Sequence, residues 1–555
     1  MNNPEHQALQ NRIYYSTALV LCIYKLWLVA DLPYVISMTS PHDATWMALK
    51  SMHIYAGEWM GEYGDRTLIK GPVFSIFLAA IAKLGIPPKL AVDTLYVIAS
   101  LFCLKLFTTV SGSRVAGIFA FTLVLFNPVT FSAYWVGALR QHVYLPITII
   151  FLSSLGLILN NFFRHERFGI WNVLICATAL ALAWNTREES IWMLPALGIA
   201  LLSILLNISK NLKQLVRLGM TCLVIAATPF LIWHSLASKN QEHYGFYGVV
   251  DFKSEQFQRA INGILSLVTI DNESNHHLTQ ESKEKLLQIS ESTRELITPL
   301  LDEQLNHYTH YGASISATTA AWAIRDSMAF NGYYASFTSA EGQYKKIADD
   351  IEAYCQTNPG SCREQLIFNI LWKPSYLEKV PESIWNNVQL LTRFELFDPN
   401  IKFPDHYAGD LNWQYAMSRM YNYNAFERIK ASDENLSALT KNQKAAHQAR
   451  MQIYKWYHHA IQILSILGFI WLLLGFFFMA WRSSLPWITL IFLSGLASTF
   501  FIYIIVSITA VTVHRLLVTS TGPLLLLIGL FLSVSISYLL GKLPIPHLFG
   551  MTRRK

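Results

Sequence analysis

Charged residues and cysteines are scarce in this sequence. Only 14% of its 555 residues are Asp, Glu, Lys or Arg, whereas soluble domains carry about a quarter. The 6 cysteines lack the Cys/His spacing of a zinc site, and we find no internal repeat and no low-complexity tract. These absences argue against an ordinary soluble domain, and we expect no nucleic-acid partner.

Apolar residues are abundant instead. Hydrophobic residues make up 53% of the chain and aromatic residues 13%, a composition typical of a polytopic α-helical membrane protein. We interpret the first apolar run as a retained membrane helix, in which Lys25 snorkels toward the interface. The ten runs that we expect to span lie near 13–30, 91–111, 114–136, 141–160, 170–184, 190–207, 216–236, 458–481, 486–509 and 517–540.

The distribution of lysine and arginine predicts the topology. The run 71–85 is about 15 residues long, short for a span of ~20 residues, so we expect a juxtamembrane helix there. With the N-terminus inside, the cytoplasmic loops then carry most of the positive charge, as the positive-inside rule requires. These loops hold Arg114, Arg164, Arg167, Lys210, Lys213, Arg217, Arg482 and the basic tail.

This topology predicts three parts. Residues 1–236 form a transmembrane module whose first outer loop is 31–90, residues 237–456 form a mainly helical extracytoplasmic domain, and residues 457–555 hold the last helices and a cytoplasmic tail. In the middle part, Thr338 and Glu341 have capping-box spacing. A packed helical face follows at Tyr344, Ile347, Ile351 and Tyr354.

Two cysteines of the middle part, Cys355 and Cys362, are separated by only a short polar stretch, "QTNPGS". A disulfide between them is plausible if this part of the chain lies in an oxidising compartment.

A single carboxylate, Asp43, stands in the stretch "TSPHDATWMALK" of the first outer loop, beside His42. It could simply cap the helix that follows. The same loop ends in "YGDRTLIKGP", in which Arg66 and Lys70 supply positive charge. A carboxylate facing cations at a membrane surface suits a transferase with an anionic lipid substrate.

The Lys-Gly-Pro motif, residues 70–72, has two readings. Pro72 could lie in the first turn of a helix, with Lys70 marking the interface, or Lys70 could bind a lipid phosphate. The NTREES motif, residues 185–190, could likewise be a solvated turn. Alternatively, Arg187 clamps a phosphate through its planar donors, and Glu188 or Glu189 contacts a metal or the acceptor.

Two further basic pairs lie on the expected outer face. His514 and Arg515 begin the last span, where positive charge opposes the positive-inside trend, which favours Arg515 as a phosphate ligand over a snorkelling anchor. Arg140 and His142 in "LRQH" have a similar status, although an outer-loop histidine is more often polar surface.

Together these motifs resemble the GT-C superfamily of polytopic glycosyltransferases that use polyprenyl-phosphate sugars. The pattern is nearest to the protein mannosyltransferases and the lipid A aminoarabinose transferases. The resemblance implies that Asp43 is catalytic and that Lys70 and Arg515 hold the donor phosphate. Many relatives have a second acid where this chain has "LRQH", and Asp43 has no Asp-x-Asp partner, so no divalent metal or other cofactor is supported.

The expected activity is transfer of a sugar from a polyprenyl-phosphate carrier to a hydroxyl of a glycan, lipid or protein. One base predicts inversion at the anomeric carbon, because a retaining route needs a second, nucleophilic carboxylate. We expect a multi-pass protein of the bacterial inner membrane whose site faces the periplasm. The alternatives are a glycolipid transporter, which would place buried charges in mid-span, and a non-catalytic envelope assembly protein.

Overall fold

The computed structural model is almost entirely helical over the residues that it describes. Those residues are 4–32, 34–36, 44–132, 135–163, 169–207, 212–268, 278–301, 305, 317–363, 381–382, 385, 389, 397, 399, 419–420, 440–481 and 517–541. The expected span 486–509 lies outside them.

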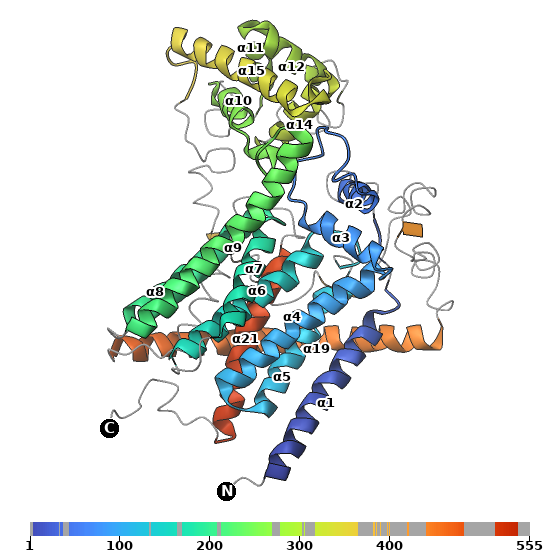
Figure 1. Ribbon diagram of the computed structural model, residues 1–555, viewed down its shortest axis with the longest axis vertical. Coiled ribbons are helices and arrows are strands. Elements are labelled where there is room, and N and C mark those ends of the chain that lie inside the picture. The colour runs from blue at the N-terminus through green and yellow to red at the C-terminus, as the bar shows by residue number, and fades with distance from the viewer. Residues whose placement is uncertain are drawn as a thin grey trace.

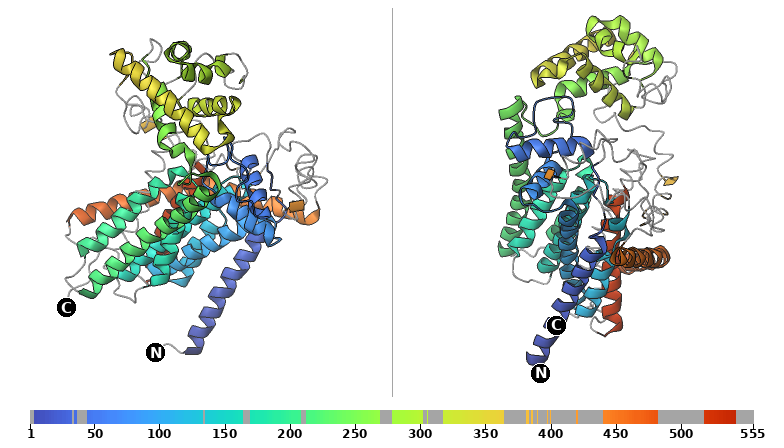
Figure 2. Two further views of the ribbon diagram at one scale, coloured as in Figure 1. Left: turned by 45° about the horizontal axis from the view of Figure 1, so that its top comes forward. Right: turned by 90° about the vertical axis from the view of Figure 1, so that its right-hand side faces the viewer.

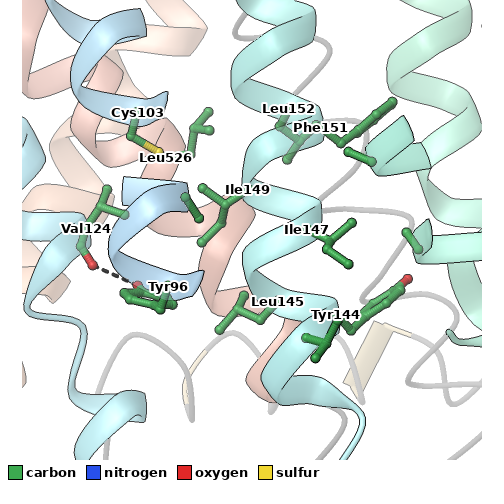
Figure 3. Close-up of a cluster of buried hydrophobic side chains, with 14 of the residues drawn as sticks. Tyr96, Cys103, Val124, Tyr144, Leu145, Ile147, Ile149, Phe151, Leu152 and Leu526 are labelled. Atoms are coloured by element: carbon green, nitrogen blue, oxygen red, sulfur yellow. Dashed lines mark hydrogen bonds between the residues drawn. The ribbon is translucent and has the colours of Figure 1, made fainter. Parts of the chain in front are cut away.

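Helix α6 (Gln141–Phe163) is the centre of a helical bundle, since 94% of its most apolar window is buried. It packs against α4 (Pro88–Ser111), α7 (Ile170–Trp184) and α21 (Leu517–Leu539). Figure 3 shows the apolar side chains that fill the space between these helices. The Tyr96 hydroxyl in this core donates a hydrogen bond of 2.7 Å to the Val124 carbonyl, which satisfies a polar group that burial would otherwise penalise.

The outermost helices of the bundle expose apolar side chains. Helix α1 (Pro4–Val29) and helix α9 (Leu212–Tyr244) are long and apolar enough to span a bilayer, yet little of each is buried in the protein. Large side chains such as Leu19 and Leu223 stay about three-fifths exposed. Helices of spanning length with exposed apolar faces are typical of proteins in a lipid bilayer, and the chain is a helical, polytopic integral membrane protein.

The expected span 114–136 is shorter in the structure. Helix α5 (Arg114–Leu125) ends before Asn127, whose side chain accepts a hydrogen bond of 3.1 Å from the Val129 amide and caps the short helix η2 (Pro128–Phe131). At 1.5 Å per residue, α5 is about 18 Å long, less than the ~30 Å hydrocarbon core. The Asn-Pro step ends the helix although the apolar composition continues.

Lys25 does not snorkel, contrary to expectation. Its side chain is fully buried, and its ammonium donates to the Thr130 hydroxyl and lies 3.9 Å from the ring centroid of Phe131. The protein itself therefore surrounds this cation. Lys89 and Asp93 in the first turns of α4 form a buried ion pair. The Lys89 Nζ and Asp93 Oδ2 atoms are 2.6 Å apart.

Two short helices form the outer end of the bundle. Helix α2 (Trp46–Ala56) packs against α3 (Val73–Lys83), which has only 11 residues and lies within the segment expected to be juxtamembrane. Figure 1 shows both at the end of the bundle opposite the start of α1. Thr45 stands before the α-helical part of α2 and makes no side-chain capping bond; the capping expectation for Asp43 falls outside the described residues.

Helix α9 leads from the bundle toward a separate set of helices, here called the outer helical group (Figures 1 and 2). This group has a hydrophobic core of its own, contributed by each of its helices. It comprises α10 (Glu255–Ser266), α11 (Gln280–Ile289), α12 (Glu291–Leu301), α14 (Ala317–Phe330) and α15 (Phe337–Thr357).

The start of α15 differs from the expected capping box. The N-cap is Ser336, whose hydroxyl accepts from the Ser339 amide, and not Thr338. Glu341 instead accepts hydrogen bonds from Ser254 and from the Phe257 amide at the start of α10. The expected apolar face is buried at Tyr344, Ile347 and Ile351, with Tyr354 partly buried beside it. Cys355 in the last turn of α15 forms a disulfide with Cys362, and their Cα atoms are 5.6 Å apart.

Helix α19 (Lys441–Trp481) is a continuous helix of 41 residues. Its polar first half packs on α1, where Arg450 forms an ion pair of 2.6 Å with Asp31. Figures 1 and 2 show it crossing the bundle steeply relative to α21. The expected span 458–481 is therefore the second half of a longer helix that contains no proline to end it.

Candidate functional site

The Lys-Gly-Pro and NTREES motifs meet in the structure. A Cβ atom on Gly71 would lie 1.9 Å from the Asn185 carbonyl oxygen, so only glycine fits this close approach of two backbones. Pro72 occupies the N-cap position of α3 and not its first turn. The backbones of the two motifs, which are more than 100 residues apart in the chain, therefore meet at Gly71 and Asn185.

Arg187 is buried rather than exposed on a solvated turn. Its side chain is only 7% exposed, and its guanidinium lies 5.6 Å from the ring centroid of Tyr144 in α6. The Tyr144 hydroxyl accepts hydrogen bonds from Ser190 at 3.1 Å and from the Trp192 indole at 2.9 Å. Tyr144 therefore contacts this turn at Arg187, Ser190 and Trp192. The interpretation as a solvated turn is wrong for Arg187, because its side chain is buried.

The "LRQH" residues lie beside the same turn. Arg140 donates a hydrogen bond of 2.9 Å to the Thr186 carbonyl. His142 lies in the first turn of α6, is fully buried and has its Nδ1 atom 3.2 Å from the Tyr34 hydroxyl. Its ring centroid is 4.6 Å from that of Trp135. His142 is therefore not polar surface, because it is buried against Tyr34 and Trp135.

A cavity of about 340 Å³ opens where these motifs meet the segment that follows α9. Arg187 and Lys253 supply positive charge to its wall, and Trp184 and Trp233 supply apolar surface. A site with apolar walls and a few convergent cations suits a ligand with an anionic head and an apolar body. Its wall is formed by Gly71, Trp184–Arg187, Trp233, Phe246–Val250 and Lys253–Glu255.

Lys70 and Arg66 lie against the outer helical group. The Lys70 ammonium is 5.8 Å and the Arg66 guanidinium 5.5 Å from the ring centroid of Trp322 in α14, within the range of cation–π attraction. Arg66 also pairs with Asp326 of α14, and with Asp65 at 2.9 Å. Arg66 therefore connects the first outer loop to α14.

Asp251 and Arg325, which sequence reasoning missed, form a buried ion pair of 2.7 Å beneath this contact. Tyr63 donates a hydrogen bond of 3.1 Å to Asp251, and the Asp251 amide donates to the Leu68 carbonyl at 2.9 Å. Burial alone would lower the pKa of Arg325, but the adjacent Asp251 carboxylate raises it. No local sequence signal indicates this pair, because its members are 74 positions apart.

Lys50 of α2 was also missed. Its side chain is 2% exposed, and burial lowers its pKa to about 7. Asp251 opposes this shift, whereas Lys70, Arg140 and Arg325 add to it. The charges that act on Lys50 therefore include several of the residues described above. A lysine within the apolar helix "WMALKSM" is the only sequence signal for it.

Four predicted residues, Asp43, His42, His514 and Arg515, lie outside the described residues. Glu188 and Glu189 belong to the short helix η4 (Glu188–Trp192), and their side chains are also outside the described set. Over the described part of the chain, no group of three or more His, Cys, Asp or Glu side chains could hold a metal ion.

Comparisons with known proteins give only a weak similarity. No protein-family model and no curated protein matches the sequence. Among solved structures, the chain is similar to the crystal structure of ArnT from Cupriavidus metallidurans bound to undecaprenyl phosphate, with 12% identity and a TM-score of 0.33. The match covers 81% of this chain and 76% of that one. At this level of similarity, the function has to be argued from this chain's own residues.

Proposed function

We propose that the protein is a membrane glycosyltransferase that moves a sugar from a polyprenyl-phosphate carrier to an acceptor hydroxyl on the extracytoplasmic face. One observation carries the proposal. The Gly71–Asn185 contact joins the Lys-Gly-Pro and NTREES motifs at a cavity whose wall includes Gly71 and Arg187. This is where the phosphate of a lipid carrier would emerge from the bilayer.

The cations have a defined task in this reaction. When the bond between the sugar and the phosphate breaks, negative charge grows on the phosphate oxygens. Preorganised positive groups in a site shielded from water stabilise such charge more than solvent does. We assign this role to Lys70, Arg187 and Arg515. Arg187 is held in advance by its contact with Tyr144 and its buried turn, so little side-chain freedom is lost on binding.

Asp43 is the proposed general base. It would take the proton from the acceptor hydroxyl as that oxygen attacks the anomeric carbon, and the polyprenyl phosphate would leave from the opposite face. A single displacement of this kind inverts the anomeric centre. Lys50 and Asp251 are assigned no step in the transfer.

Replacement of Asp43 by Asn tests this role. Transfer from a radiolabelled polyprenyl-phosphate sugar by purified protein in detergent should fall by about 10²–10⁴-fold, the usual contribution of a general base. The melting temperature should stay unchanged. Full activity of Asp43→Asn would overturn the assignment.

Gly71→Ala tests the contact itself. Its methyl group would clash with the Asn185 carbonyl and force the two motifs apart, so transfer should fall although neither Lys70 nor Arg187 is altered. Gly342→Ala is the matched control, because a Cβ atom there meets nothing within 4 Å.

The transporter alternative makes a different prediction about charge. Of the described residues, the buried pair Lys89–Asp93 lies in the first turns of α4, and Asp31–Arg450 lies just beyond the end of α1. Neither pair is in mid-span, where a transport pathway would place it. Activity in detergent separates the two functions, because transfer needs no sealed compartment and transport does.

A further inference from the structure

A second cavity, of about 560 Å³, lies between α2 and the segment 58–67. Trp46, Leu49, Lys50 and His53 of α2 form one wall. No residue is common to this wall and that of the cavity beside Arg187. The proposed donor site therefore does not account for it.

Two residues of this wall carry hydrogen-bond donors that lack acceptors. The Trp46 indole nitrogen and the Lys50 ammonium are both shielded from solvent, and neither has a hydrogen-bond partner within the described part of the chain. They are four positions apart on α2 and thus lie on one face of the helix. Because buried donors without acceptors cost stability, an unsatisfied pair such as this points to a ligand that supplies an anionic oxygen.

The rest of the lining, from the segment 58–67, has the reverse character. Glu58 and Glu62 contribute exposed carboxylates, and Glu58 lies 2.7 Å from the His53 ring. Carboxylates accept hydrogen bonds from hydroxyl groups but repel anions. A ligand that suits both walls has an anionic group near α2 and hydroxyl groups toward the solvent, which is the arrangement of a phosphorylated sugar.

We infer that this cavity binds a phosphate-bearing saccharide, with Lys50 and Trp46 as donors to the phosphate. The inference rests on the proposed function for one point, namely that this saccharide is the headgroup of the acceptor. It deepens that function because it makes the acceptor an anionic glycan and not a neutral one.

The test measures binding of glucose 1-phosphate to the purified full-length protein by ³¹P NMR line broadening. Wild type and the control Lys345→Met, which alters an exposed lysine of α15, should both broaden the signal. Lys50→Met loses a charge-assisted hydrogen bond, so its affinity for glucose 1-phosphate should fall by about tenfold or more. Lys50→Arg should retain most of the binding. Inorganic phosphate should compete, and glucose should not. Equal binding by Lys50→Met and wild type would overturn the inference.

Two further measurements isolate this site. Because a sugar phosphate also fits the proposed donor site, binding is compared in an Arg187→Gln background: Arg187→Gln/Lys50→Met should lose the binding that Arg187→Gln retains, and equal binding by these two variants would contradict the inference. Lys50→Met should melt no lower than wild type, since it removes a buried charge without a partner. A lower melting temperature would show a structural role for Lys50 and would also count against the site.

Failure of this inference differs from failure of the proposed function. If sugar transfer persists but Lys50→Met binds glucose 1-phosphate normally, the subsite is wrong and the glycosyltransferase stands. If binding depends on Lys50 but no polyprenyl-phosphate sugar is ever used, the subsite stands and the transferase is wrong.

Discussion

Lys50 shows how one buried side chain connects stability with pH. In the unfolded chain a lysine keeps its proton up to about pH 10.4, whereas burial lowers the pKa of folded Lys50 to about 7. Between these values the folded protein binds fewer protons than the unfolded one, so its stability rises with pH. The groups that face this ammonium are Asp251, Lys70, Arg140 and Arg325, and the cavity wall adds His53, Glu58 and Glu62.

Thermal melting between pH 6 and pH 9 measures this effect. We expect Lys50→Met to melt above wild type at pH 6, where the buried ammonium is charged, and the difference to shrink toward pH 9. A tenfold change in a protonation equilibrium corresponds to about 1.4 kcal/mol, so the difference in melting should be readily measured. The expectation would be contradicted if the melting temperatures of Lys50→Met and wild type differed by the same amount at every pH. The control Lys345→Met should melt like wild type throughout this range.

At the scale of elements, the buried Asp251–Arg325 pair joins three segments. Arg325 belongs to α14, Asp251 follows α9, and both contact residues 63–68 of the first outer loop. This loop leads directly into the Lys-Gly-Pro motif. The outer helical group therefore helps to fix the position of Lys70, although it lies apart from the bundle helices.

Breaking this pair should destabilise the protein. Arg325→Met leaves the buried Asp251 carboxylate without its cation, which should lower the free energy of unfolding by about 3–5 kcal/mol. The double variant Asp251→Asn/Arg325→Met should recover part of that loss, because no buried charge remains. Arg259→Met is the matched control: its ion pairs with Asp349 and Glu352 are partly exposed, and such pairs contribute about 0–1 kcal/mol. Urea or thermal unfolding measures all three variants, and equal losses for Arg325→Met and Arg259→Met would contradict the prediction.

At the scale of the whole molecule, orientation in the membrane decides what the site can reach. The outer helical group and helices α2 and α3 lie at one end of the bundle, and the start of α1 lies at the other (Figure 1). Of the positive residues of the expected cytoplasmic loops, Arg114 begins α5 and Arg217 lies in the second turn of α9, whose other end leads toward the outer helical group. From the positive-inside rule we propose that the site faces the outside.

Cysteine labelling in intact cells tests this orientation. In a Cys222→Ser background, which removes the exposed free cysteine, Lys345→Cys on α15 should react with a membrane-impermeant maleimide. Arg217→Cys, an exposed position near the start of α9, should react only after the cells are opened. The reverse pattern would place the site in the cytoplasm and exclude transfer from a carrier displayed outside.

Parts of the candidate site were predictable from the sequence. Lys70 and Arg187 stand in short polar motifs between apolar segments, a local pattern that a single sequence displays. Lys50 was not predictable, because a lysine in an amphipathic helix is usually exposed and only packing buries it. Asp251 and Arg325 were not predictable either, since nothing local relates two residues that pair across a fold.

The sequence by itself determined the class of protein. Apolar runs of spanning length must enter a bilayer, and a backbone in lipid must form helices to satisfy its own hydrogen bonds. Tertiary structure alone decided which polar residues meet. The contact of Gly71 with Asn185 and the burial of Lys50 depend on how helices pack, and packing joins residues that are distant in the chain. The local pattern of apolar and polar residues carries no record of such pairs.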